Sequence, residues 1–174
     1  MLRSKGDLMH KFILMFFIVM ASCASNSYLE DNYYYNNVEG IDYVILPYEP
    51  TADDGIIVAF REGIPAELTA NELENMDALL HEAVYKYNTE TKTPWGGDVN
   101  TIDLSKYNRQ YIAIINENKE KEVFINCFWS SSIRESGYWK NNFVLVMDGG
   151  YHFFQVKINL TKQIITMFSV NGYA

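Results

Sequence analysis

The most regular pattern along the chain is helical and lies near its centre. Apolar residues recur every three or four positions over residues 70–88, which predicts an amphipathic helix with one buried face. The residues on that face are Leu73, Met76, Leu80, Ala83, Val84 and Tyr87. Thr69 and Glu72 form a capping-box sequence, and Leu68 can pack against Leu73. We therefore expect the helix to start directly after Thr69 and to end near Asn88.

A different pattern, typical of β-strands, occupies most of the remaining chain. Strands are expected over residues 43–46, 56–60, 111–115, 122–129, 143–147, 151–160 and 164–170. Alternation is clearest over 151–160, where the even-numbered residues are expected to be buried and the odd-numbered residues to face a wetter surface. Polar residues 116–121 predict a hairpin turn, and Asp148-Gly149-Gly150 predicts a tight turn that favours positive φ angles.

One helix followed by strands joined through short turns indicates an α+β protein. The short polar hairpins argue against βαβ crossovers in the C-terminal half. We expect one amphipathic helix packed on a four- to five-stranded antiparallel sheet, in a cystatin-like arrangement. Residues 89–105 and 130–142 are expected to be connecting loops.

The N-terminal segment, residues 1–22, has the layout of a secretory signal. Its first 11 residues carry basic charge, the next ten are apolar without interruption, and small residues lead to Cys23. Ten apolar residues are too few to cross a bilayer, which needs about 20. Met20-Ala21-Ser22-Cys23 resembles a lipobox, so cleavage would leave Cys23 lipidated at the new N-terminus. The alternative is an ordinary signal followed by an incidental cysteine. A start at Met9 would give the same mature protein.

Lipidation of Cys23 would hold the protein on a membrane, because each buried methylene contributes about 0.8 kcal/mol. No aspartate follows Cys23 directly, which favours the outer over the inner membrane of a bacterial cell envelope. Residues 23–40 are polar and rich in Tyr and Asn, and we expect a partly disordered tether there. The aromatic residues of 33–37 could instead pack as an edge strand. The single α+β domain is expected to cover residues 41–174.

Composition and charge limit the class of protein and the kinds of partner that it can bind. With 48 % hydrophobic and 15 % aromatic residues, the chain is too apolar to be disordered. After residue 22 it has 11 Lys and Arg residues against 21 Asp and Glu residues, a net charge of −10. Such an acidic body is repelled by nucleic acid, so we expect no nucleic-acid partner.

The two cysteines do not make a disulfide scaffold. Lipidation of Cys23 would leave Cys127 without a partner. Cys127 lies in the apolar run 123–129, so we favour a buried, inert thiol over a reactive one.

The C-terminal half carries several distinctive segments. They include Val146-Met-Asp-Gly-Gly150, Phe153-Phe-Gln-Val-Lys-Ile-Asn-Leu160 and Val170-Asn-Gly-Tyr-Ala174. These segments resemble a group of uncharacterised small secreted and lipid-anchored proteins of Bacteroidota, over about the last 70 residues. The resemblance implies an exported protein and assigns no catalytic residue.

No residue pattern indicates catalysis or a cofactor. His81-Glu82 lacks the second histidine of a metalloprotease helix, and His152 is expected to be a packed residue at a strand end. The chain has no nucleophile elbow, phosphate loop or dinucleotide fingerprint. The acidic pair Asp53-Asp54 is best explained as a solvated surface. We therefore expect a non-enzyme without cofactors or bound metal.

Aromatic residues are the one chemically distinctive residue type that is unusually frequent in this chain. Trp129 lies in a strand and is expected in the core, whereas Trp95 and Trp139 lie in loop-like segments and are candidate binding residues. The leading hypothesis is a non-catalytic cell-envelope lipoprotein that binds a protein or peptide partner through the sheet edge or the loops. The alternative is a carbohydrate-binding accessory lipoprotein that stacks these aromatic rings on sugars.

Overall fold

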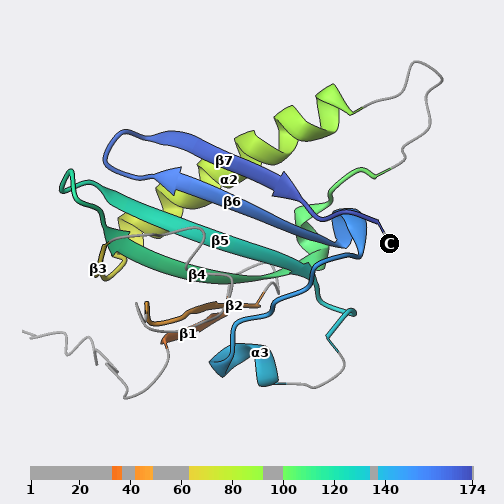
Figure 1. The fold of residues 1–174 in the computed structure, drawn as a ribbon, viewed down its shortest axis with the longest axis horizontal. Helices are drawn as coiled ribbons and strands as arrows, with labels where there is room; N and C mark the ends of the chain where they lie inside the picture. Colours follow the sequence, from red (N-terminus) through yellow and green to blue (C-terminus); the bar gives the residue numbers. More distant parts are fainter. Residues whose placement is uncertain (1–32, 37–41, 49–62, 92–99, 134–136, 174) are drawn as a thin grey trace, which may run out of the picture.

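A computed structural model describes residues 33–36, 42–48, 63–91, 100–133 and 137–173 (Figure 1). Cys23, Trp95 and the strand expected over 56–60 lie outside these ranges. Within them, no helix is both long enough and apolar enough to cross a bilayer.

The main helix, α2, spans Ala70–Glu90 and confirms the helical pattern. Its capping box is formed as expected: the Thr69 amide donates to Glu72 Oε2 at 2.8 Å, and the Glu72 amide donates to Thr69 Oγ1 at 3.3 Å. These bonds satisfy main-chain donors that the first turn of a helix leaves free. The buried face consists of Met76, Leu80, Ala83 and Val84.

The strands form one sheet. Their bounds are Tyr33–Asn36 (β1), Asp42–Ile45 (β2), Ile64–Pro65 (β3), Tyr107–Ile115 (β4), Lys121–Trp129 (β5), Phe153–Asn159 (β6) and Ile164–Val170 (β7). The order is β1-β2-β4-β5-β6-β7, with the two-residue β3 paired to the end of β4. The expected antiparallel meander is present as β4 to β7.

The fold is therefore α+β, with one main helix on a sheet, as the sequence predicts. Two details differ. The sheet has more than four or five strands, and it is mixed, because β2 runs parallel to β4. The connection from β2 to β4 contains α2, and a helix-bearing connection is what allows two sequential strands to pair in parallel. The cystatin-like arrangement is matched only roughly.

The first strand, β1, falls within the segment expected to be a tether. It pairs antiparallel with β2, from Tyr33 opposite Ile45 to Asn36 opposite Asp42. The sequence left two possibilities for residues 33–37, a partly disordered tether or an edge strand, and the structure has an edge strand over Tyr33–Asn36. The sheet therefore begins at Tyr33, eight residues before the domain boundary expected from composition.

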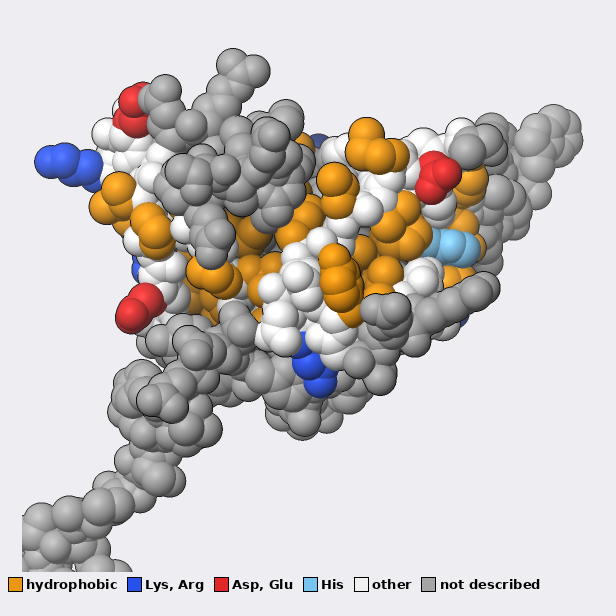
Figure 2. All heavy atoms as spheres, turned by 60° about the horizontal axis from the view of Figure 1, so that its bottom comes forward, with side chains coloured by type: hydrophobic (Ala, Val, Ile, Leu, Met, Phe, Trp, Pro, Cys, Tyr) orange, Lys and Arg blue, Asp and Glu red, His pale blue; other side chains and the backbone are white. Residues whose placement is uncertain are grey.

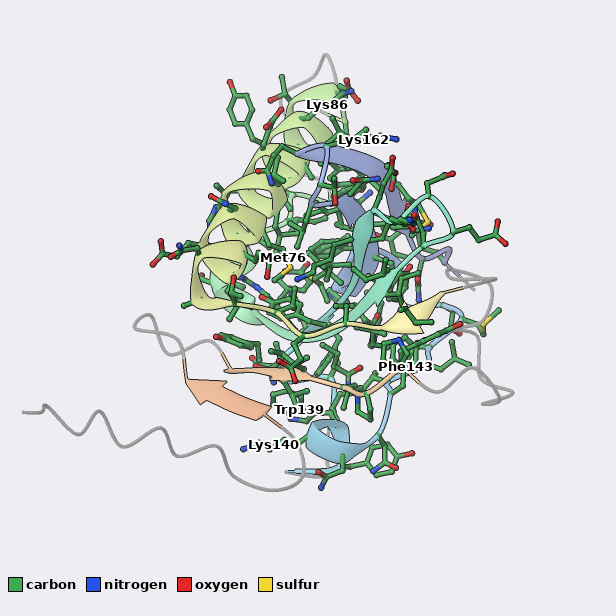
Figure 3. All side chains as sticks on the ribbon, turned by 90° about the vertical axis from the view of Figure 1, so that its left-hand side faces the viewer. Met76, Lys86, Trp139, Lys140, Phe143 and Lys162 are labelled. Carbon is green, nitrogen blue, oxygen red and sulfur yellow. The ribbon has the colours of Figure 1, made fainter. Side chains whose placement is uncertain are left out.

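The sheet is buried on both faces. On one face, α2 covers a core that includes Met76, Leu80, Val123, Ile125 and Phe154. On the other, a second core is built from residues that include Ile112, Phe124, Phe128, Trp139 and Val144. Figure 3 shows Met76 between α2 and the sheet, and Trp139, in the short helix α3 (Tyr138–Asn141), on the other side of the sheet.

The predicted strand over residues 143–147 is wrong. This segment joins no strand. It belongs to residues 139–148, which begin in the short helix α3, continue without regular secondary structure against the second core, and which we call the strap. Strap side chains still alternate: Val144 is buried and Leu145 exposed, Val146 is half-buried and Met147 exposed. The strand prediction came from the unbroken apolar run over residues 143–147, and this run lines a core without joining the sheet. The strap's main chain has other partners, described below.

The turn at Asp148-Gly149-Gly150 is confirmed, with φ angles of 88° at Gly149 and 55° at Gly150. It leads into a 3-10 helix, Gly150–His152, and then into β6. The Gly150 amide donates to the Gly172 carbonyl at 3.0 Å. A Cβ on Gly150 would lie 2.2 Å from the Tyr173 ring. The glycine turn and the C-terminal segment are thus packed directly against each other.

Replacement of Gly150 by alanine should destabilise the fold by roughly 1–3 kcal/mol, because alanine adds both a left-handed backbone cost and a clash with Tyr173. Chemical denaturation measures the free energy of unfolding. Gly172→Ala is the matched control, since a Cβ there meets nothing within 4 Å and the φ angle is not in the left-handed region. Equal stability of the two variants would contradict this packing.

Candidate interaction surfaces

The candidate binding residue Trp139 is not exposed, which corrects the sequence-based expectation. It lies in α3 with 5 % of its surface accessible, and its ring meets Phe128 edge-on with centroids 5.5 Å apart. Trp139 fills the second core instead of projecting from a loop. The other candidate, Trp95, lies outside the described residues.

Trp129 and His152 support each other at the end of the sheet. Trp129 packs against the helix-side core, as expected, and the His152 ring stacks on it with centroids 3.7 Å apart. His152 is therefore a packed residue. Its Nε2 atom is buried and has no hydrogen-bond partner among the described residues. No group of three or more potential metal ligands occurs in the described part of the chain.

Cys127 is buried in the helix-side core, which confirms the expectation of an inert thiol. Burial raises its pKa to about 12, so the reactive thiolate is scarce near neutral pH. Beside it lies Arg109, which is only 2 % exposed and pairs with Asp77 on α2. Asp77 also lies 3.5 Å from the exposed His81. This group joins the helix to β4, and the sequence analysis missed Arg109 because it stands inside a strand pattern.

A row of carboxamide side chains crosses the second face of the sheet and was also missed. It comprises Gln110 on β4, Asn126 on β5, Gln155 on β6 and Asn171 just after β7, and we call it the carboxamide row. Gln110 stands directly opposite Asn126, and Asn126 opposite Gln155. Asn126 Nδ2 donates to Gln110 Oε1 at 3.1 Å, and Gln155 Nε2 donates to Asn171 Oδ1 at 3.2 Å.

The carboxamide row holds the main chain of the strap. Gln110 Nε2 donates to the carbonyls of Trp139 and Asn142, and Gln110 Oε1 accepts from the Val144 amide at 2.9 Å. Asn126 Nδ2 donates to the Val144 carbonyl at 2.7 Å. At the far end, Asn171 Nδ2 donates to the Val146 and Asp148 carbonyls. Because buried main-chain groups need partners, these side chains replace the neighbouring strand that the strap lacks.

The strap presents apolar side chains to solvent. Leu145 is 54 % exposed and Met147 is 84 % exposed, and Tyr138 in the preceding α3 is 51 % exposed. Figure 2 shows this side of the molecule with apolar side chains over much of the described surface and few charged ones. The outer face of α2 differs: Glu74, Glu82 and Glu90 are exposed there. The two sides of the sheet are thus covered by surfaces of different character.

The last strand, β7, forms an open end of the sheet. Figure 1 shows it at the top of the meander, and among the described residues no strand pairs with its outer side. Its seven residues, Ile164–Val170, include no charged side chain and no proline. The register with β6 shifts at Thr166, and residues 167–170 continue as a regular strand beyond that bulge.

Comparisons with protein-family models, with curated proteins and with solved structures found no match to this chain.

Replacement of Gln110 by methionine should lower the free energy of unfolding by roughly 2–4 kcal/mol. The change keeps the side-chain length but leaves the Val144 amide and two strap carbonyls without their partner. Asn108→Leu is the matched control. Asn108 lies on β4, as Gln110 does, and stands opposite Phe128 of β5. Its side chain has no hydrogen bond to another described residue. A loss of stability that is equal in both variants would contradict the role assigned to Gln110.

Proposed function

We propose that this protein is a non-catalytic lipoprotein of the bacterial cell envelope that binds a protein or peptide partner at the open edge of β7. The lipid anchor would be Cys23, after removal of residues 1–22, and the outer membrane is the favoured location. The support for the anchor is the basic, apolar and small-residue order of the N-terminal segment and the lipobox-like Met20-Ala21-Ser22-Cys23.

The observation that carries partner binding is the unpaired outer side of β7 within the described residues. An open strand edge offers a row of main-chain donors and acceptors that another strand can complete. Natural proteins often protect such an edge with charged side chains or proline, and β7 has neither. The bulge at Thr166 limits the regular pairing segment to residues 167–170.

The partner would add as an extended segment beside β7. Main-chain hydrogen bonds would supply affinity, and alternate side chains of the added strand would meet neighbours on the two faces of the sheet. Because β7 is uncharged in a chain of net charge −8, this contact does not require a basic partner and depends little on salt.

A non-catalytic role is supported by the pairing of charged side chains in the described domain. Arg109 pairs with Asp77, Lys121 with Glu72, Lys157 with Glu122 and Lys162 with Glu120. Each pair ties one element of the fold to another. The carbohydrate-binding alternative required exposed rings at Trp95 and Trp139. Because Trp139 is buried, this alternative now depends on Trp95 alone. A glycan array on the intact protein tests it.

A photocrosslinking amino acid at position 169 should capture a discrete partner in intact cells that make the protein, because Ser169 is exposed on β7. The matched control is the same amino acid at position 131, where Ser131 is equally exposed after the end of β5. Ser169→Lys should reduce co-purification of that partner at least fivefold, whereas Ser131→Lys should leave it unchanged.

Without crosslinking, co-purification of the partner should persist at high salt, since β7 carries no charge. Adducts of the same pattern from both positions, or full recovery of the partner with Ser169→Lys, would exclude β7 as the binding edge.

A further inference from the structure

We infer that the strap lies against the lipid bilayer, so that Leu145 and Met147 enter the membrane interface and α2 faces away from it. The inference rests on the lipid anchor at Cys23 proposed above. It leaves β7 as a separate surface for a protein partner. Three observations carry it: the exposed apolar residues of the strap, the difference in charge between the two sides of the sheet, and the place where the chain enters the domain.

The apolar residues of the strap are held in place before any contact is made. Leu145 stands between Val144 and Val146, whose main-chain groups are bonded by Gln110, Asn126 and Asn171. The exposed side chains of Leu145 and Met147 therefore project from a fixed backbone. A contact made by such residues does not have to order a flexible loop first.

The charges of the two sides favour one orientation at a membrane. Over Ala70–Glu90, α2 has five acidic residues and one lysine. Over residues 138–148, α3 and the strap have only Lys140 and Asp148, and their charges cancel. Bilayers that contain anionic lipids carry a negative surface potential, which repels the acidic helix and not the neutral strap.

The chain enters the domain close to the strap. Tyr33, the first residue of β1, lies ten positions after Cys23, and even a fully extended chain over ten positions spans only about 35 Å. Figures 1 and 3 show β1 near α3, the helix that leads into the strap, and β1 and β7 stand at opposite ends of the strand order. An anchor at Cys23 therefore brings this end of the domain nearest to the bilayer.

Two apolar side chains would bind a membrane only weakly from solution. A short tether changes this, because it holds the domain at an effective concentration of about millimolar next to the surface. A weak contact is then sufficient to fix an orientation.

The test uses the whole lipidated chain, reconstituted into phosphatidylcholine vesicles, with a polarity-sensitive fluorophore on Met147→Cys. Glu82→Cys on α2 is the matched control, since both positions are exposed. Cys127 stays unlabelled because it is fully buried, and Cys23 is blocked by its lipid. We expect the probe at position 147 to shift its emission to the blue and to be quenched by nitroxide-labelled lipids, while the probe at 82 reports water. Leu145→Cys should repeat the result of position 147.

Flotation of the vesicles separates the possible failures. If the protein floats with the vesicles but the probes at 147 and 145 report water as the probe at 82 does, the anchor stands and the orientation is wrong. If the protein does not float, the anchor itself fails, and the inference fails with it. If the blue shift requires dense packing of protein and vanishes at high lipid-to-protein ratio, a second copy covers the strap, and the bilayer contact is rejected.

Discussion

The row of carboxamides across the second face of the sheet is the constraint on which most of the structure depends. Gln110 and Asn126 are almost completely buried, and their amide groups bond both to each other and to the strap. A buried polar network of this kind is favourable only when its members are satisfied. The strap supplies the missing partners, so the network and the path of the strap determine each other.

This arrangement explains how the sheet is covered on both faces although α2 packs against only one of them. On the first side, α2 packs on β6 and β7 through contacts such as the stacked rings of Tyr87 and Phe168, and the pair Arg109–Asp77 fixes it to β4. On the second side no comparable helix is present among the described residues. The strap, Trp139 and residues of β2 take its place, and they close the second core. The cover on this side is thin, which is why Leu145 and Met147 remain at the surface.

Local periodicity predicted the elements whose neighbours are close in sequence. The capping box at Thr69, the buried face of α2, the meander from β4 to β7 and the positive φ angles of Gly149 and Gly150 all follow from nearby residues. The errors concern distant partners. Residues 143–147 form an unbroken apolar run, as a buried strand does, but their main chain meets Gln110, which is 34 residues away from Val144. The odd-numbered residues of 151–160 were expected to face a wetter surface, whereas Phe153 and Asn159 are buried.

The candidate site was less predictable than the fold for the same reason. An aromatic residue in a loop-like segment is exposed only if the segment stays away from the core, and the connection that contains Trp139 returns to it. The open edge of β7 follows from strand order, which depends on the parallel pairing of β2 with β4 at the other end of the sheet. Neither property is present in a local pattern. The role of Cys23 stays a prediction, which could be made from a local pattern because a signal segment is recognised as a linear sequence.

Hydrogen exchange of the strap amides tests the central claim most directly. The Val144 amide donates to the buried Gln110 side chain, whereas the Leu145 amide next to it has no partner among the described residues. The account predicts that Val144 exchanges roughly a hundredfold or more slowly than Leu145, although neither residue belongs to a strand. Exchange of both amides at the same fast rate would show that the carboxamide row does not hold the strap.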